Sequence, residues 1–256
     1  ECGKQAGEYV TNHLLNVNFK GKKIKGTPIE DTKFKGPQDL EYEKTFWPFI
    51  LISKKRYTGD KYELNIHKPK ERTSMGIVMK RRDNAPIVKY VFGNVIEIIM
   101  NQKNIDLSIE WLRKTLQKIK DGKMNQSMFV VSKSLRGFYK NPEGIAHKVL
   151  ADRMAERNPG NKPKPNDRIP YAYFKLPDEQ LYDYDNRYKS GKRKGQPREK
   201  KILQGDRIEH PEYITQKKLK IDYSFYISNQ IMNPVKQVLD LEKSEEETTL
   251  FFNQFI

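Results

Sequence analysis

The chain has 256 residues, and its 49 lysines and arginines outnumber its 33 aspartates and glutamates to give a net charge of +16. It is long enough to bury a core in one large domain or two small ones. Its single cysteine, Cys2, excludes an internal disulfide framework and a cysteine-based zinc site. No apolar run reaches the ~20 residues that span a bilayer, and no signal peptide opens the chain. Because the first residue is Glu rather than Met, we expect the chain to be a piece of a longer protein.

The positive charge is the first indication of function. A pI near 9.6, with lysine and arginine spread over the whole length, favours a polyanionic partner. Nucleic acid is the leading candidate and an acidic membrane surface is the second. The alternative is that the basic residues only solvate a large surface.

The first third of the chain predicts a short helix followed by strands. Apolar residues at helical spacing predict the end of a helix within residues 3–15, and a Lys/Gly-rich connector follows over residues 21–36. We expect paired strands over residues 40–46, 48–57 and 61–66. Thr58-Gly59-Asp60 is the turn signal between the second and the third.

The pattern changes to helical near residue 80. A helix beginning at Ala85, with Pro86 in its first turn, is expected to bury Ile87, Val88, Val91, Val95, Ile98 and Ile99. A second helix, over about residues 106–120, is expected to bury Leu107, Trp111, Leu112, Leu116 and Ile119.

Further elements follow in order. Asn141 and Pro142 predict the start of a third helix, which Asn158-Pro159-Gly160 ends. Residues 168–174 predict a short strand. Residues 186–201 are polar and basic and predict a flexible loop. A last helix from Ile221 carries Ile221, Phe225, Met232, Val235 and Leu239, with a kink expected at Pro234 unless packing accommodates it.

These elements define an α+β fold class, in which a few antiparallel strands precede a mostly helical part. Within the strands, Phe49-Ile50-Leu51-Ile52 runs into Ser53-Lys54-Lys55-Arg56-Tyr57. If this is one continuous strand, Lys55 and Tyr57 share one face, and Lys54 and Arg56 share the other. Such a strand could present a cation and an aromatic ring to a nucleic acid. The alternative is an edge strand that lysines protect against aggregation.

The segment 41–57 closely resembles the KKRY region of family B DNA polymerases, especially the delta-like branch. Further segments resemble that family in the same order. Residues 76–86, with Lys80-Arg81-Arg82-Asp83, are similar to its basic motif at the start of the thumb. Lys133-Ser134-Leu135, residues 146–160 and residues 166–171 are similar to successive thumb segments. Residues 209–210, 221–226 and 233–234 are similar to its last elements.

The resemblance implies a division into the distal palm, residues 1–80 with the KKRY strand, and the thumb, residues 81–256 with the basic insert at about 186–201. It also implies contacts to primer–template DNA. In the family the KKRY residues touch the duplex, partly in the minor groove, where a cation can sense pair shape without reading sequence. The residues that correspond here are Lys54, Lys55, Arg56 and Tyr57, joined by Arg81 and Arg82 near the primer backbone and by Lys133 and Arg136 as thumb–phosphate contacts.

The resemblance also implies that the catalytic aspartates and the Mg²⁺ ligands lie upstream of this chain, so we expect no catalytic or metal-binding residue within it. Asp83 is expected to orient an arginine or to cap the following helix. Asp183 and Asp185 in Tyr182-Asp183-Tyr184-Asp185 only superficially suggest a carboxylate pair, and Glu43 is expected to form a salt bridge.

Two functions remain open at this point. The first is the palm and thumb of a replicative DNA polymerase, inactive as a fragment, whose parent uses deoxynucleoside triphosphates and has a sliding clamp as a candidate partner. The second is a stand-alone, non-catalytic nucleic-acid-binding module. A membrane partner is not expected, because a clear basic amphipathic helix is lacking. The chain also lacks the cysteine clusters of cellular delta-like enzymes, which favours a large-DNA-virus parent, working in the host nucleus or in a cytoplasmic virus factory.

Overall fold

The computed structural model describes residues 5–6, 43–63, 65 and 67–256. The helix and connector expected before residue 37 fall almost entirely outside these residues. The chain divides into two compact units, one of residues 1–51 and 57–74 and the other of residues 52–56 and 75–256. The fold is α+β, as expected, with antiparallel strands in small sheets. Within the described residues, no helix is both long and apolar enough to cross a membrane.

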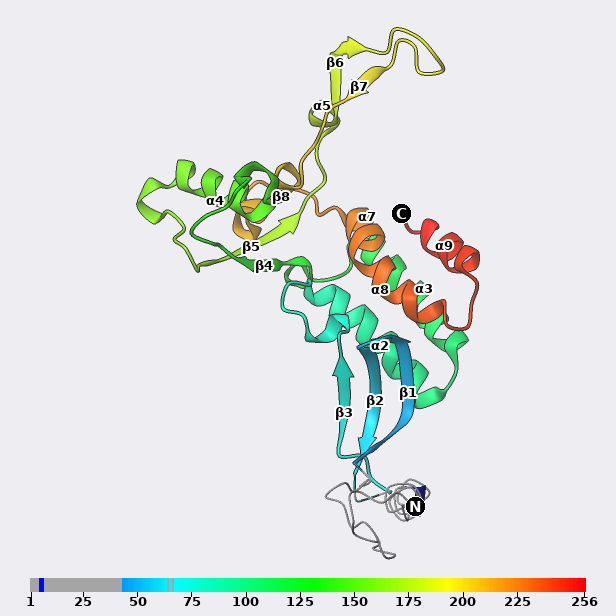
Figure 1. Ribbon diagram of the computed structural model, residues 1–256. Coiled ribbons are helices and arrows are strands. Elements are labelled where there is room, and N and C mark those ends of the chain that lie inside the picture. The colour runs from blue at the N-terminus through cyan, green and yellow to red at the C-terminus, as the bar shows by residue number, and fades with distance from the viewer. Residues whose placement is uncertain (1–4, 7–42, 64, 66) are drawn as a thin grey trace, which may run out of the picture. The chain divides into compact units, whose positions relative to one another are not determined.

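Three strands form a sheet in the order β1-β2-β3 (Figure 1), with β1 at Thr45–Ser53, β2 at Arg56–Tyr62 and β3 at Glu71–Met75. The prediction of one continuous strand over 48–57 is wrong, because the chain turns back at Lys54-Lys55. The alternation that placed Lys55 and Tyr57 on one face therefore does not hold. A two-residue connection between paired strands makes β1 and β2 an antiparallel hairpin.

The expected turn at residues 58–60 is also wrong, because these residues lie inside β2. Thr58 is 1% exposed, and its hydroxyl lies 2.8 Å from that of Ser74. Gly59 is buried, and a Cβ there would lie 2.9 Å from Cδ2 of Phe49. The glycine therefore permits close packing on β1 and does not make a turn.

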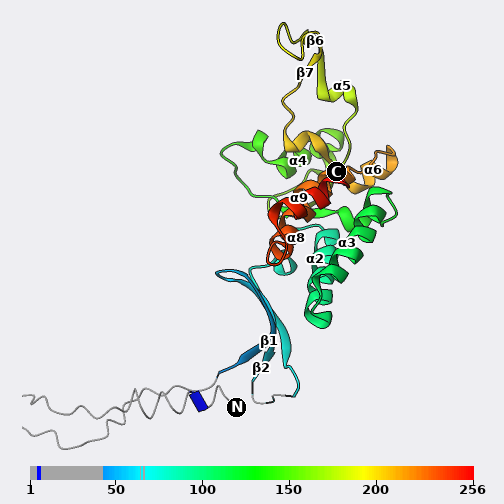
Figure 2. The same cartoon turned by 90° about the vertical axis from the view of Figure 1, so that its right-hand side faces the viewer.

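In the second unit, α2 (Pro86–Gln102) and α3 (Ile105–Lys120) pack side by side (Figure 2). Both helices were expected, and Pro86 opens α2 as predicted. The buried faces differ from the prediction. α2 buries Phe92, Ile96 and Met100 while Ile98 and Ile99 are only half-buried, and α3 leaves Leu107 exposed and Trp111 half-buried. Packing on both sides of α2 widens its apolar stripe beyond a single face.

A second sheet has the order β4-β5-β8, with β4 at Val131–Ser134, β5 at Arg168–Tyr173 and β8 at Ile208–Glu209. β5 agrees with the strand predicted over 168–174. The predicted third helix begins later than expected. Pro142–Gly144 form a short 3₁₀ turn, η4, without a side-chain cap from Asn141, and α4 then runs over Ala146–Arg157. The 3₁₀ turns η2, η3, η5 and η6 span Val78–Lys80, Gln126–Phe129, Pro159–Asn161 and Gln204–Arg207, and the helix α6 spans Pro211–Gln216.

The basic insert is the loop of a hairpin, with strands at both of its ends. After the short α5 (Asp178–Leu181), β6 (Tyr182–Arg187) pairs antiparallel with β7 (Pro197–Glu199). Residues 188–196 form the connection, as the loop prediction expects, whereas Arg187 and Arg198 lie in the strands. Tyr182 lies opposite Glu199, and Asp183 lies opposite Arg198. Backbone pairing between β6 and β7 forms this hairpin, and the pattern of charges in the sequence does not predict that pairing.

The expected break at Pro234 is accommodated by a wide helical turn. After α7 (Tyr223–Phe225), Tyr226–Ile231 form a π-helix, η7, which continues into α8, Met232–Leu239. A proline removes the hydrogen bond to the carbonyl four residues before it and collides with that carbonyl. The π-turn directly upstream widens the backbone where Pro234 requires room.

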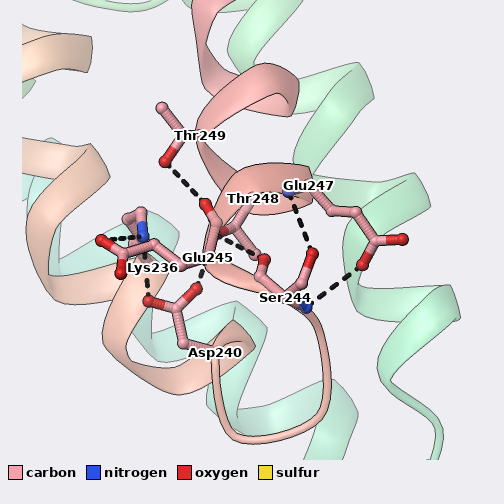
Figure 3. A network of polar contacts seen from close by, with 7 residues as sticks. All are labelled: Lys236, Asp240, Ser244, Glu245, Glu247, Thr248 and Thr249. Atoms are coloured by element: carbon pink, nitrogen blue, oxygen red, sulfur yellow. Dashed lines mark hydrogen bonds and ion pairs between the residues drawn. The ribbon is translucent and has the colours of Figure 1, made fainter.

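The helix α9, Glu245–Asn253, is fixed to α8 by a polar network that Figure 3 shows. Lys236 of α8 lies 3.1 Å from both Asp240 and Glu245. Ser244 and Glu247 form a reciprocal capping box at the start of α9, with distances of 3.2 and 3.1 Å. Thr248 donates its hydroxyl to Asp240. The network positions the first turn of α9 against α8.

Tyr226 joins three elements of the second unit and gives a stability prediction. Its hydroxyl is fully buried, donates to the carbonyl of Phe129 at 2.5 Å and accepts from the N–H of Tyr173 at 3.0 Å. Tyr226→Phe leaves both backbone groups without this partner, so we expect a loss of about 2 kcal/mol in urea denaturation. Tyr223→Phe is the matched control, because this half-buried ring also packs on Phe129, at 5.1 Å. An equal loss in both variants would contradict the assignment.

Candidate nucleic-acid interface

The turn between β1 and β2, residues 54–56, is called the basic turn below. Lys54 and Lys55 are exposed, and Arg56 is half-buried at the start of β2. Lys55 has a φ of 63°, a left-handed conformation that costs a non-glycine residue about 1–2 kcal/mol. The four consecutive residues predicted to contact DNA, 54–57, therefore do not lie along one strand. Lys54 and Lys55 form the tip of the hairpin.

Gly76 packs directly against the basic turn. It follows β3 with a φ of +62°, and a Cβ at this position would lie 2.2 Å from the carbonyl oxygen of Lys55 and 3.1 Å from Cγ of Arg56. Both the backbone conformation and the close approach therefore require glycine. Residues 52–56 and 75–83 belong to the same unit. The start of the basic motif at residues 76–86 is therefore held against the basic turn.

Within that motif, Asp83 orients Arg81. The guanidinium donates from Nε and Nη2 to the two carboxylate oxygens at 3.0 and 2.8 Å. The hydrogen bonds from Arg81, and more weakly the charge of Lys133, hold the pKa of Asp83 below its usual range. The expectation that Asp83 orients an arginine is confirmed, whereas the cap of α2 is Ala85. Arg82 is exposed.

Lys133 and Arg136 lie at the end of β4. Lys133 is half-buried in the strand, opposite Ile169 of β5, and Arg136 is exposed two residues beyond the strand. The structure adds Arg168, which sequence reasoning passed over. Its guanidinium donates to the Ser132 carbonyl at 2.6 Å, on the neighbouring strand. Cations from β4, β5 and the following loop therefore gather at one sheet end.

Tyr57 is part of an aromatic cluster in the first unit. Its ring centroid lies 5.9 Å from that of Phe46 and 5.6 Å from that of Phe49, and the residue is half-buried. These contacts give Tyr57 a packing role in the sheet. Its contact with DNA stays a prediction.

The carboxylates do not assemble into a metal site in the part of the chain that the structure describes, where no group of three or more His, Cys, Asp or Glu residues is close enough to hold an ion. Asp83 is paired with Arg81. Asp183 and Asp185 lie in β6. Glu43 pairs with Lys44, as expected. These residues do not fit a two-metal centre.

Comparison with known proteins identifies the family. Residues 13–241 match the model of DNA polymerase family B, so the chain belongs to this family. It is 47% identical over 218 residues to a DNA polymerase of Pyramimonas orientalis virus, covering 85% of the chain and 16% of that protein. It is also 47% identical over 227 residues to a DNA polymerase of Acanthamoeba polyphaga mimivirus, covering 86% of the chain and 12% of that protein.

A cellular relative and a solved structure are less similar. The DNA polymerase delta catalytic subunit of Candida albicans is 28% identical over 207 residues, covering 81% of the chain and 18% of that protein. The family B DNA polymerase of the archaeon Pyrobaculum calidifontis superposes with a TM-score of 0.52 at 17% identity, over 76% of the chain and 21% of that structure. The chain thus spans less than a fifth of these curated relatives, and its identity is higher to the two viral polymerases than to this cellular enzyme.

Proposed function

We propose that this chain is the distal palm and thumb of a DNA-directed DNA polymerase, and that it holds the primer–template duplex during template-directed nucleotidyl transfer. The observation that carries the proposal is the basic turn fixed by Gly76 to the segment bearing Arg81 and Arg82. The 47% identity to two viral DNA polymerases supports a polymerase fragment over a stand-alone nucleic-acid-binding module. The palm is residues 1–80 and the thumb is residues 81–256 in this proposal.

The catalytic chemistry is proposed to come from other parts of the parent protein. We propose that the ligands of Mg²⁺, the divalent ion expected for phosphoryl transfer, lie outside this chain. Within the described residues the carboxylates do not fit a metal centre. Deoxynucleoside triphosphates are the proposed substrates of the parent, and a sliding clamp is a proposed partner. The residues of this chain act by charge and shape on the DNA backbone and minor groove.

The basic turn offers a test that separates charge from folding. Lys55→Gly removes a cation but suits the φ of 63°, so the full-length protein should keep its melting temperature while its affinity for primer–template falls about tenfold. The slope of log affinity against log salt should become shallower by about 0.9 for each phosphate that the variant no longer neutralises. Fluorescence anisotropy with EDTA present isolates DNA binding from metal chemistry.

Lys218→Gly is the matched control, because Lys218 is also an exposed lysine with a positive φ, of 52°. It should leave the affinity and the salt slope unchanged. An unchanged affinity in Lys55→Gly, or an equal loss in both variants, would refute the proposed role of the basic turn.

A further inference from the structure

Two side chains, Tyr139 and His147, form a series of hydrogen bonds that begins at the backbone N–H of Arg136. The hydroxyl of Tyr139 accepts from the N–H of Arg136 at 2.7 Å and lies 3.0 Å from Nε2 of His147. Tyr139 thus holds the backbone N–H of Arg136, and His147 holds the hydroxyl of Tyr139.

The sheet holds this backbone only as far as Leu135. Its pairing extends past β4 only to Leu135, whose N–H donates to the carbonyl of Asp167 at 2.8 Å and whose carbonyl accepts from Asn166 at 2.7 Å. Arg136 is the first residue beyond this pairing. Its N–H is satisfied by a side chain instead of by a strand.

The protonation of His147 fits this arrangement. The hydroxyl of Tyr139 accepts from the N–H of Arg136, and Nε2 of a neutral His147 ring can accept the hydrogen of that hydroxyl. Burial, followed by the charge of Lys133 and more weakly that of Arg136, lowers the pKa of His147. The neutral His147 ring therefore offers an acceptor to the hydroxyl of Tyr139, which in turn accepts from the N–H of Arg136. The two rings also meet edge to face, with centroids 5.8 Å apart.

We propose that Tyr139 and His147 are positioning residues that fix the backbone of Arg136, the first residue beyond the strand pairing, and so hold this cation in place to bind DNA phosphates together with Lys133 of β4. This inference rests on the proposed function, since it presumes that the two cations contact DNA. Two mobile cations would lose conformational entropy on binding, whereas cations on a fixed backbone lose less. The two residues therefore contribute to affinity without touching DNA.

A set of variants of the full-length protein tests the inference on primer–template DNA. Lys133→Ala with Arg136→Ala should lower the affinity at least tenfold and make the salt slope shallower by about 0.9 for each of the two phosphate contacts. Tyr139→Phe removes only the hydroxyl and should lower the affinity about fivefold, with a shallower salt slope and a nearly unchanged melting temperature. Adding Tyr139→Phe to the double variant should cause no further loss.

The outcomes distinguish the two proposals. An unchanged affinity in the double variant would refute the phosphate contacts, and with them the positioning role. Two outcomes would refute only the positioning role, given a weakened double variant. One is an unchanged affinity in Tyr139→Phe, and the other is a loss from Tyr139→Phe that persists in the triple variant. His147→Gln, which keeps a donor and an acceptor, should bind better than His147→Leu, and equal binding by these two variants would contradict the inference. Tyr90→Phe, on an exposed tyrosine of α2, is the control and should bind normally.

Discussion

Gly76→Ala is expected to destabilise the chain by about 2–5 kcal/mol and to weaken DNA binding by the full-length protein at least tenfold. The φ of +62° alone costs alanine about 1–2 kcal/mol. The added Cβ would lie 2.2 Å from the carbonyl oxygen of Lys55, which is backbone, so the basic turn itself must move. Such overpacking typically costs a further 1–3 kcal/mol. Urea denaturation of the chain and anisotropy of the full-length protein measure the two effects.

Gly191→Ala separates the cost of conformation from the cost of contact. Gly191 lies in the β6–β7 connection with a φ of +80°, and a Cβ there would meet nothing within 4 Å. We expect this variant to lose only about 1–2 kcal/mol. The same loss in both variants would show that the contact between Gly76 and the basic turn is unimportant.

Arg157→Ala is expected to cost about 3–5 kcal/mol, because it leaves a buried carboxylate without its cation. The side chain of Glu209 is 3% exposed, and its Oε2 accepts from Nη2 of Arg157 at 2.8 Å. The guanidinium also stacks on Tyr213, 3.8 Å from the ring centroid. The pair joins α4 to β8, so we expect the loss as a lower urea midpoint of the purified chain.

Two further variants test the cause of this loss. Glu209→Gln in the Arg157→Ala background removes the unpaired charge and should recover part of the stability. Arg193→Ala breaks an exposed pair with Glu199, of 61% and 65% exposure, and should cost less than about 1 kcal/mol. Equal losses at the buried and the exposed pair would contradict the role of burial.

The helices α2 and α3 followed from the sequence alone, whereas α5, α6 and α9 were not predicted. The spacing of apolar residues placed α2 and α3 within a residue of their observed starts, and Pro86 marked the first turn of α2. The spacing of apolar residues along the sequence indicates which face of a helix is buried, so it locates long amphipathic helices well. The strand and helix patterns also gave the α+β class. The family came instead from the resemblance of residues 41–57 and of the later segments to family B DNA polymerases.

Only the tertiary structure decided the geometry of the candidate interface. Thr58-Gly59-Asp60 carries a stronger local turn signal than Lys54-Lys55, yet the chain turns at the lysines, because Gly59 packs on Phe49 and Gly76 packs on Lys55. Tyr139 and His147 received no role from the sequence, since Tyr139 binds the backbone N–H of Arg136 and His147 binds the hydroxyl of Tyr139. Turn position and backbone hydrogen bonds depend on contacts between segments that are distant along the chain, and a local pattern of residue types does not encode these contacts.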